Sequence, residues 1–487
     1  MALTKVDVIN GLLKHNYFPA HSREHEELPP CFTSEALDMT IAAKILPPSS
    51  RSTSGYDDIE YRLTQYSGVP RYLSIPHPSA YSKLCLCIYK NWRKLNYVED
   101  NEKSLIRPLK HKDGRLLIMD YENSETALHR HHRMSFARRF MVKADISNCY
   151  PSIYSHAIPW AAVGFTHAKA SRAATEWFNE LDNCVRTLKR CETQGVGIGP
   201  GASAIVAEVI LARVDEDLKK KYEFVRFIDD YRAYCADETE AQHFISDLGD
   251  ALAKYKLRLN TKKTGISILP QAHLPAWRSE LAMQLRGLEY VNASTATTFL
   301  SLAMTTANEH PEGSVVKYAL KSLIRSPISP EAKFELGYQV IDLAFHQPNL
   351  LPSLGNLLDI KRRNCHFSDE FQKIAYEHAS KRRSDGVCWS LYFLKTYGVK
   401  VPDQVANEVL ASHDCMSLIM LYISGETRHR KQVIDFAKSL REVDNYDKDK
   451  YWLLLYKIFE EGRMGNPYTG DDTFKTLKDN RVSFMTT

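Results

Sequence analysis

The stretch FVRFIDDYRAYC, residues 224–235, constrains the fold more than any other part of the sequence. Phe227 and Ile228 read as the end of one apolar strand, and Tyr231 reads as the start of the next. A two-residue hairpin loop prefers Asn-Gly or Asp-Gly, because both of its central residues need positive φ. Asp229 and Asp230 satisfy that preference poorly, and their charges repel each other. Taken alone, the pair fits a solvated turn best, so other segments must decide whether it is an acidic tip that holds cations.

A second acidic strand end lies upstream. FMVKAD (140–145) is predicted to be a strand that ends at Asp145, and the helix-rich segment after it can return the hairpin beside that strand. We therefore expect Asp145, Asp229 and Asp230 on adjacent strand ends. Three carboxylates there favour two bound Mg²⁺ ions, roughly 3.5–4 Å apart, with Mn²⁺ as an alternative ion. Such a site activates an attacking hydroxyl and stabilises a leaving pyrophosphate, which is phosphoryl-transfer chemistry.

A glycine-rich segment, GVGIGPGAS (195–203), precedes a strongly apolar helix. Alternate glycines let a backbone approach a ligand closely, and the following helix offers free N–H groups. GIGPGA also matches a dinucleotide-binding fingerprint, with Asp229 as the later acid. That fingerprint must follow a buried strand, whereas the preceding NCVRTLKRCETQ is charged and helix-like. The phosphoryl-transfer interpretation is therefore favoured over dinucleotide binding.

The pattern along the chain predicts three regions and an α+β fold. Residues 1–75 alternate polar stretches with prolines, which predicts an irregular N-terminal extension with one short helix near 34–45. Residues 76–300 mix helices with strands, including a short strand at LRLN (257–260). Residues 301–487 contain amphipathic helices of similar length, which favours an all-α helical-repeat domain of the stacked, HEAT-like solenoid kind.

Composition limits the cellular setting and the partners. No uninterrupted apolar run is long enough to cross a bilayer, and the N-terminus does not resemble a signal peptide. The ten cysteines form no CxxC pair, so a reducing, cytoplasmic setting without a membrane partner is expected. A formal net charge of +5 permits nucleic acid, but favours a short or single-stranded contact over a long duplex.

Four segments occur in the order of reverse-transcriptase motifs A to D: KADISNCYPSIYSHAIPWA, GVGIGPGAS, FVRFIDD and KYKLRLNTKKT. Upstream, RPLKHKDGRLL resembles the fingers hairpin that grips the incoming triphosphate. The residues of the first two motifs resemble those of the bacterial abortive-infection (Abi) reverse transcriptases, especially the prophage-borne kind. In that group a helical-repeat domain follows the polymerase core. The resemblance therefore implies a right-hand polymerase palm and fingers, followed by helical repeats.

The resemblance also assigns roles at the predicted catalytic centre. It implies that Asp145 and Asp229 are the principal metal ligands and that Asp230 is the supporting third acid. The resemblance also implies that Lys263 of the fourth motif donates a proton to pyrophosphate. The alternative is that Lys263 is an ordinary solvated loop lysine.

Nucleotide-binding roles follow in the same way. Lys112 and Arg115 match the cations that grip the triphosphate, against the alternative of an exposed charged hairpin. Tyr150 stands where the family places an aromatic gate against the ribose 2′-OH, against the alternative of a core tyrosine. In the second motif, the glycine loop with Gly199 and the helix-opening Ser203 match nucleotide-binding positions, although N-capping is an adequate explanation for Ser203.

Two observations predict the mode of synthesis: a departure of the second motif from the usual family sequence, and the resemblance to the Abi group. Gly197 and Ile198 stand where the family usually has Pro and Gln, and that Gln normally helps to arrange nucleotide and template. Abi relatives imply untemplated DNA synthesis primed by a protein hydroxyl, in defence against phage. The partners implied are dNTPs, a single-stranded DNA product and further copies of the chain, in a trimer or hexamer. Two alternatives stay open: a conventional RNA-templated reverse transcriptase and a non-catalytic nucleic-acid-binding scaffold.

A priming tyrosine is sought in the N-terminal region, which we expect to be mobile. Tyr17 and Tyr56 are the candidates put forward, with SGYDD around Tyr56 in the most loop-like context. Tyr61, Tyr66 and Tyr72 share the region, and simple packing is the alternative for each of the five.

Overall fold

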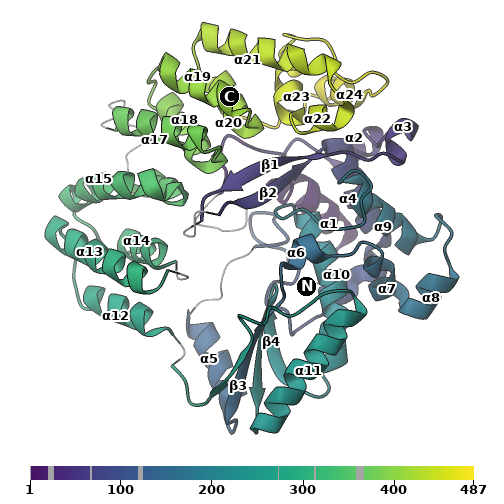
Figure 1. The fold of residues 1–487 in the computed structure, drawn as a ribbon, viewed down its shortest axis with the longest axis vertical. Helices are drawn as coiled ribbons and strands as arrows, with labels where there is room; N and C mark the ends of the chain where they lie inside the picture. The colour runs from purple at the N-terminus through teal and green to yellow at the C-terminus, as the bar shows by residue number, and fades with distance from the viewer. Residues whose placement is uncertain are drawn as a thin grey trace.

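The computed structural model describes residues 2–19, 27–65, 69–118, 124–272, 274–311, 314–357 and 367–486. Figure 1 shows a sheet-containing region and a succession of helices that runs from its edge around to the N-terminal segments. In the described part of the chain, no helix is long and apolar enough to cross a membrane.

The sheet-containing region is built on four antiparallel strands in the order β4-β5-β3-β6. Their bounds are β3 Phe140–Asp145, β4 Glu223–Phe227, β5 Asp230–Cys235 and β6 Gly265–Ile268. The strand expected at 140–145 and the hairpin after residue 222 are therefore confirmed. The strand expected at 257–260 is reduced to a single bridge between Ile146 and Leu259, and β6 pairs with β3 instead.

Helix α11 (Glu238–Lys254) packs on β3 and β5. Its Phe244, Leu248 and Leu252 are fully buried, because apolar residues at this spacing share one helix face. Behind α11 lies α10 (Gly201–Leu218), which is buried along most of its length. The remaining helices here are α4 Pro78–Leu95, α5 Ser124–Ser135, α6 Cys149–Ser152, α7 Ala157–Val163, α8 Phe165–Ala170 and α9 Trp177–Thr187, with a 3₁₀ turn at Asn96–Val98.

The short helix expected near 34–45 is present in the N-terminal region as α2, but the expectation of an irregular extension around it is wrong. The region contains α1 Lys5–Asn10, a π-helical turn at Gly11–His15, α2 Met39–Lys44, α3 Ser49–Ser52 and the antiparallel hairpin of β1 (Asp58–Leu63) and β2 (Arg71–Pro76). Ile59 and Tyr61 of β1, and Leu73 and Ile75 of β2, are buried. That alternation was readable in the sequence, but the long link between the strands concealed the hairpin.

Beyond β6 the described chain is helical, as expected. The helices are α12 Ala276–Leu285, α13 Ala293–Glu309, α14 Val315–Arg325, α15 Pro330–His346, α16 Leu354–Leu357, α17 Ser368–Ser380, α18 Ser384–Thr396, α19 Asp403–Ser412, α20 Cys415–Ser424, α21 Thr427–Ser439, α22 Asn445–Asp449, α23 Trp452–Glu460 and α24 Thr473–Asp479, with 3₁₀ turns at Pro348–Ser353 and Leu440–Glu442.

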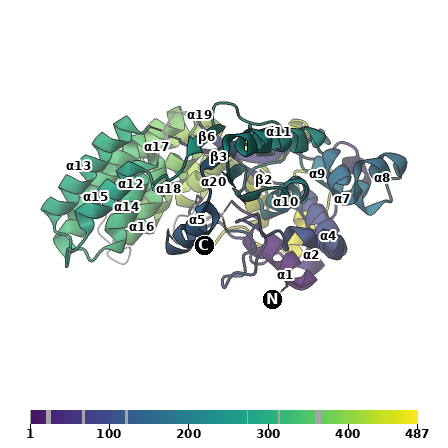
Figure 2. The ribbon, with the colours of Figure 1, turned by 90° about the horizontal axis from the view of Figure 1, so that it is seen from below.

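Neighbouring helices along this part of the chain pack together: α13 with α14 and α15, and α17 with α18 and α19. Figures 1 and 2 show α12 to α15 at one end of the molecule and α7 and α8 at the other. A true helical repeat stays a prediction. The domain boundaries proposed from the sequence, after residues 75 and 300, fall inside β2 and α13 respectively.

Helices of the C-terminal part of the chain pack against the N-terminal region. Strand β1 contacts α18 and α20, and α2 contacts α24. Trp452 of α23 donates its indole N–H to the carbonyl of Ile75 at 3.2 Å. Arg51 of α3 forms a buried ion pair with Asp449 of α22. The helical region is therefore packed against the N-terminal hairpin by buried polar and apolar contacts.

Candidate active site

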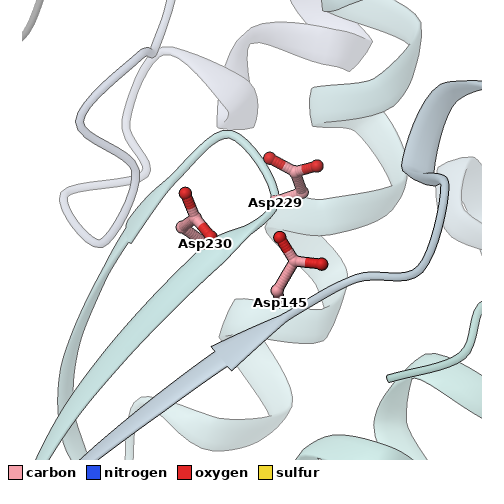
Figure 3. Close-up of side chains that lie close together, drawn as sticks. All are labelled: Asp145, Asp229 and Asp230. Carbon is pink, nitrogen blue, oxygen red and sulfur yellow. The ribbon is translucent and has the colours of Figure 1, made fainter. Parts of the chain in front are cut away.

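Three carboxylates meet at one end of the sheet (Figure 3). Asp145 is the last residue of β3 and stands opposite Asp230, the first residue of β5. Asp229 precedes Asp230 in the loop of the β4–β5 hairpin. Each residue offers an oxygen, and these oxygens all lie within 4.8 Å of one another. The structure thus brings together the three acids that the sequence places on adjacent strand ends.

The hairpin tip differs by one residue from the turn expected in the sequence. Phe227 pairs with Asp230, so Ile228 and Asp229 form the loop and Asp230 belongs to the strand. Ile228 adopts φ of +56°. For a β-branched residue this conformation is a genuine outlier, with a strain of about 1–3 kcal/mol that the surrounding structure must offset.

Arg226 supplies one part of that support. Its side chain is fully buried, and its Nη1 donates to the carbonyl oxygen of Ile228 at 2.8 Å. The same guanidinium forms ion pairs with Glu208 (2.8 Å) and Asp215 (2.7 Å) of α10. Tyr231 of β5 donates its hydroxyl to Asp215 at 2.9 Å. A buried charge network therefore attaches both strands of the acidic hairpin to α10.

Sequence reasoning did not identify this network. A signal was present, because Arg226 alternates with Phe224 on the inward face of β4. Glu208 and Asp215 lie seven residues apart on a helix that is buried along most of its length, and buried charges need partners. What the sequence does not show is that the cation and the two acids face each other.

Burial, together with repulsion from neighbouring acids, raises the pKa values of Asp229 and Asp230. Burial raises the pKa of Asp230 to about 6, and the charges of Asp229 and Asp145 add to the shift. Burial also raises the pKa of Asp229, with the charge of Asp145 acting in the same direction and Lys263 and Arg71 opposing it. A divalent cation would relieve this repulsion, and carboxylate oxygens are the ligands that Mg²⁺ prefers. The donor set therefore fits the predicted metal.

Both oxygens of Asp145 are also held by side chains from the segment that follows α11. Asn260 donates to Oδ1 at 2.9 Å, and Lys263 Nζ donates to Oδ2 at 3.1 Å. The hydrogen bond to Asp145 raises the pKa of Lys263, and the ionised acids around it reinforce that shift. Lys263 therefore lies beside the acid cluster, and its role as a proton donor stays a prediction. Asn260 was missed, although it lies in the same quoted segment.

Tyr150 lies on α6, just beyond the end of β3. It is half-buried, and its carbonyl accepts a hydrogen bond from the Val196 N–H at 3.0 Å, which ties the first motif to the second. Burial raises the pKa of its phenol, and the charge of Asp229 contributes to the same shift. The charge of Asp229 therefore acts on Tyr150. The role of Tyr150 as a gate against the ribose 2′-OH stays a prediction.

Lys112 and Arg115 lie in a turn that is anchored to the N-terminal helices. Arg115 Nη2 pairs with Asp113 at 2.7 Å within the same turn, while Lys112 is exposed. Leu116 donates its N–H to Asn16 at 2.7 Å. The Leu109 N–H is bonded to the Leu116 carbonyl at 2.9 Å, so the chain turns back on itself here, but residues 105–118 form no strand and residues 119–123, which follow, lie outside the described residues. Triphosphate binding by Lys112 and Arg115 stays a prediction, and Arg71 is a cation near the acids that the sequence did not single out.

The glycine loop is packed against the protein's own chain. A Cβ on Gly197 would lie 2.5 Å from the Ser74 side chain, and one on Gly199 would lie 2.8 Å from Pro19. The Ser74 N–H also donates to the Ile198 carbonyl at 2.7 Å. The close approach that these glycines permit is made, within the protein, by β2 and the N-terminal segment, and the approach of a ligand to this loop stays a prediction. Nucleotide binding at Gly199 stays a prediction.

Ser203 is buried inside the first turn of α10, where Pro200 occupies the N-cap without a side-chain hydrogen bond. The capping explanation for Ser203 is therefore wrong, and its predicted contact with a nucleotide is untested.

The two tyrosines put forward as primers are both core residues. Tyr17 is fully buried and donates its hydroxyl to the Pro76 carbonyl at 2.6 Å. Tyr56 is fully buried, stacks on His77, and bonds Ser79 and Asp471 at 3.2 Å each. The expectation of an exposed, loop-like setting is wrong for both. Tyr61 is buried as well, Tyr72 is 47% exposed, and Tyr66 lies outside the described residues.

Comparison with known proteins decides the class of this site. Residues 90–304, which contain all three acids and Lys263, match the family model of reverse transcriptase (RNA-dependent DNA polymerase). The chain carries a reverse transcriptase domain. This domain is a polymerase, and hence a nucleotidyltransferase, and the α+β organisation predicted from the pattern along the chain agrees with it.

Solved structures add a distant likeness. Apo telomerase from Candida tropicalis is 11% identical over 84% of this chain and 69% of its own, with a TM-score of 0.32. A C-terminally truncated form is 12% identical over 48% of this chain and 54% of its own, with a TM-score of 0.29. Telomerase from Candida albicans with a telomeric RNA fragment has a TM-score of 0.29 at 11% identity, over 84% of this chain and 67% of its own. Scores of this size carry no argument about substrate. No curated protein matches the sequence.

Proposed function

We propose that this protein is a DNA polymerase of the reverse-transcriptase type that adds deoxynucleotides without a template, onto a tyrosine of the protein itself, in abortive-infection defence against bacteriophage. The proposal includes a cytoplasmic location and a homo-oligomeric state. The observation that supports it most is the cluster of Asp145, Asp229 and Asp230 inside a reverse transcriptase domain.

The three acids would hold the divalent cations, which when bound supply charge neutralisation and activation of the attacking hydroxyl. The chain's own residues supply position and protons. Asn260 and Lys263 fix both oxygens of Asp145, and Arg226 holds the loop that presents Asp229. Lys263 carries a proton at neutral pH and lies beside the acids, where it can donate that proton to the leaving pyrophosphate.

Absence of a template is supported by the second motif. Gly197 and Ile198 replace the Pro and Gln that arrange nucleotide and template in the family. In the structure this loop is hydrogen-bonded and closely packed against β2, through Ser74. The backbone that would meet a templating base is thus engaged with the N-terminal hairpin.

Among the described tyrosines of the N-terminal region, exposure favours Tyr72 as the primer. It lies on β2 next to Arg71, whose charge acts on Asp229, and it is 47% exposed. Tyr17 and Tyr56 could reach a phosphate only if the core around them opened. We therefore place Tyr72 ahead of the two tyrosines chosen from the sequence.

The test is incubation of the purified protein with labelled dNTPs and Mg²⁺, with and without an annealed RNA–DNA primer. The proposal predicts label bound covalently to protein in the absence of any template, and loss of that label in Asp229→Asn. Tyr72→Phe should remove the label, whereas Tyr56→Phe should retain it. Extension of the annealed primer with no protein-bound label would instead establish a conventional RNA-templated reverse transcriptase.

A further inference from the structure

A cavity of about 970 Å³ lies outside the acid cluster, between helices α7 and α8 and the C-terminal end of α11. Figures 1 and 2 place α7 and α8 at the end of the molecule opposite to α12–α15. The cavity is therefore a feature of the polymerase region, and the helical region does not line it.

Four aromatic side chains line this cavity: Tyr154, Trp160, Phe165 and Tyr255. Trp160 contacts Phe165 edge-on, with ring centroids 5.1 Å apart, and Tyr154 contacts Trp160 at 5.8 Å. Phe165 is 57% exposed, an unusual position for a phenylalanine on a protein surface. Trp160, by contrast, is buried, and Tyr154 and Tyr255 are half-buried, so Phe165 is the exposed ring of the four. An exposed ring at the edge of a cavity is a platform on which a nucleobase can stack.

Three lysines accompany the rings: Lys169, Lys254 and Lys256. Lys169 Nζ lies 5.1 Å from the Trp160 ring centroid and 5.5 Å from that of Phe165. Lys254 also pairs with Asp217 at 2.8 Å, but both of those side chains are solvent-exposed, so the pair is weak. The described lining residues include no carboxylate, which leaves the cavity positively charged.

Two walls of the cavity belong to chain segments that also carry residues of the acid site. One wall, at Ser152 and Tyr154, continues the chain that leaves β3 at Asp145. The other wall, at Tyr255 and Lys256, continues to Asn260, which bonds Asp145. The two segments pair with each other on the way, since the Ser147 N–H donates to the Arg258 carbonyl at 2.8 Å.

We propose that this aromatic–lysine cavity binds single-stranded DNA, with a base stacked on Phe165 and phosphates held by Lys254 and Lys256. The strand is the polymerase's own product, and for that identity the inference rests on the proposed function. A free nucleoside triphosphate fits less well, because the described lining offers neither an arginine nor an acid to hold a metal-bound triphosphate.

The test measures binding of a fluorescently labelled oligothymidylate by anisotropy in EDTA, where no synthesis occurs. Phe165→Ala should weaken binding about tenfold, in line with the contribution of one stacked base. The double variant Lys254→Glu/Lys256→Glu should weaken binding at low salt and flatten its salt dependence. The controls are Phe345→Ala in α15 and Lys475→Glu in α24, which are exposed residues outside the cavity and should leave binding unchanged.

The outcomes separate this site from the proposed function. If wild-type protein makes no DNA but binds the strand, and both cavity variants lose that binding, the cavity stands and the polymerase proposal fails. If synthesis proceeds while both cavity variants bind the strand as tightly as wild type, the cavity proposal is overturned. Cavity-dependent binding of dTTP with no binding of the strand would likewise overturn it, by assigning the cavity to free nucleotides.

Discussion

At the scale of single residues, neighbouring side chains offset both the charge repulsion and the backbone strain of the acidic hairpin. Ile228 adopts a left-handed conformation that its side chain disfavours, and Asp230 carries a raised pKa. Arg226 holds the carbonyl of Ile228, and Asn260 and Lys263 hold Asp145. These contacts keep the three acids close together in spite of their like charges.

Replacing Arg226 by Met should destabilise the fold by about 3–5 kcal/mol, because it leaves Glu208 and Asp215 buried without their cation. Urea denaturation followed by circular dichroism measures this change. The matched control is Lys219→Ala, which removes an exposed ion pair with Glu216 and should cost less than about 1 kcal/mol. Equal stability of the two variants would show that the network does not support the hairpin.

Lys263→Ala should lower kcat for nucleotide addition by roughly a hundredfold with little change in KM for the nucleotide, as expected for loss of a proton donor. Lys262→Ala, at the exposed neighbouring position, is the control and should retain normal rates. Single-turnover kinetics give both constants. A change in KM alone would make Lys263 a binding residue.

Added Mg²⁺ should raise the melting temperature more at pH 7.5 than at pH 5. The pKa of Asp230 is about 6, so below pH 6 a proton occupies the group that a cation needs, and above it the carboxylate is free. Differential scanning fluorimetry in Mg²⁺ and in EDTA provides the comparison. Asp230→Asn should lose most of this pH dependence, and a shift of equal size at both pH values would argue against the metal site.

At the scale of secondary-structure elements, the β1–β2 hairpin connects the N-terminal region to the C-terminal helices. Thr64, just after β1, donates its N–H to Asp385 of α18 at 2.8 Å, and Arg62 donates its N–H to Ser384 at 3.0 Å. β2 in turn packs against the glycine loop through Ser74. The hairpin therefore contacts both the helical region and the second motif.

Asp385→Ala should destabilise the protein by about 1–3 kcal/mol, because it leaves buried N–H groups of Thr64 and Gly386 without an acceptor. Asp385→Asn keeps one acceptor oxygen and should recover part of the loss. The control, Asp369→Ala, removes an exposed acid from the first turn of α17. Thermal denaturation of the three variants would contradict this account if Asp385→Ala behaved like the control.

Features that depend on residues close together in the sequence could be predicted, whereas contacts between residues far apart in the sequence could not. The acids could be placed because apolar periodicity located the strand ends beside them, and Lys263 followed from the order of the motifs. The partners of Arg226 and the contact of Asn260 with Asp145 depend on elements distant along the chain. Tyr17 and Tyr56 were misjudged for the same reason, since their polar surroundings in the sequence concealed their burial against Trp452, Phe484 and Asp471.

At the scale of the whole molecule, the helical region is part of the polymerase's structure. Tyr17 packs on Trp452 and Phe484, and Arg51 pairs with Asp449. A chain truncated after residue 300, the boundary proposed from the sequence, should therefore be insoluble or unfold at a much lower temperature than the whole chain. Circular dichroism and gel filtration would test this. A stable, monodisperse fragment would show that the polymerase region folds independently.

Intact-mass spectrometry after incubation with Mg²⁺ and a single dNTP would reveal whether the acid cluster adds nucleotides to the protein itself. The wild-type chain should carry a ladder of added nucleotide masses, and Asp229→Asn should carry none. A wild-type chain whose mass stays unchanged, with or without template, would contradict the proposed function.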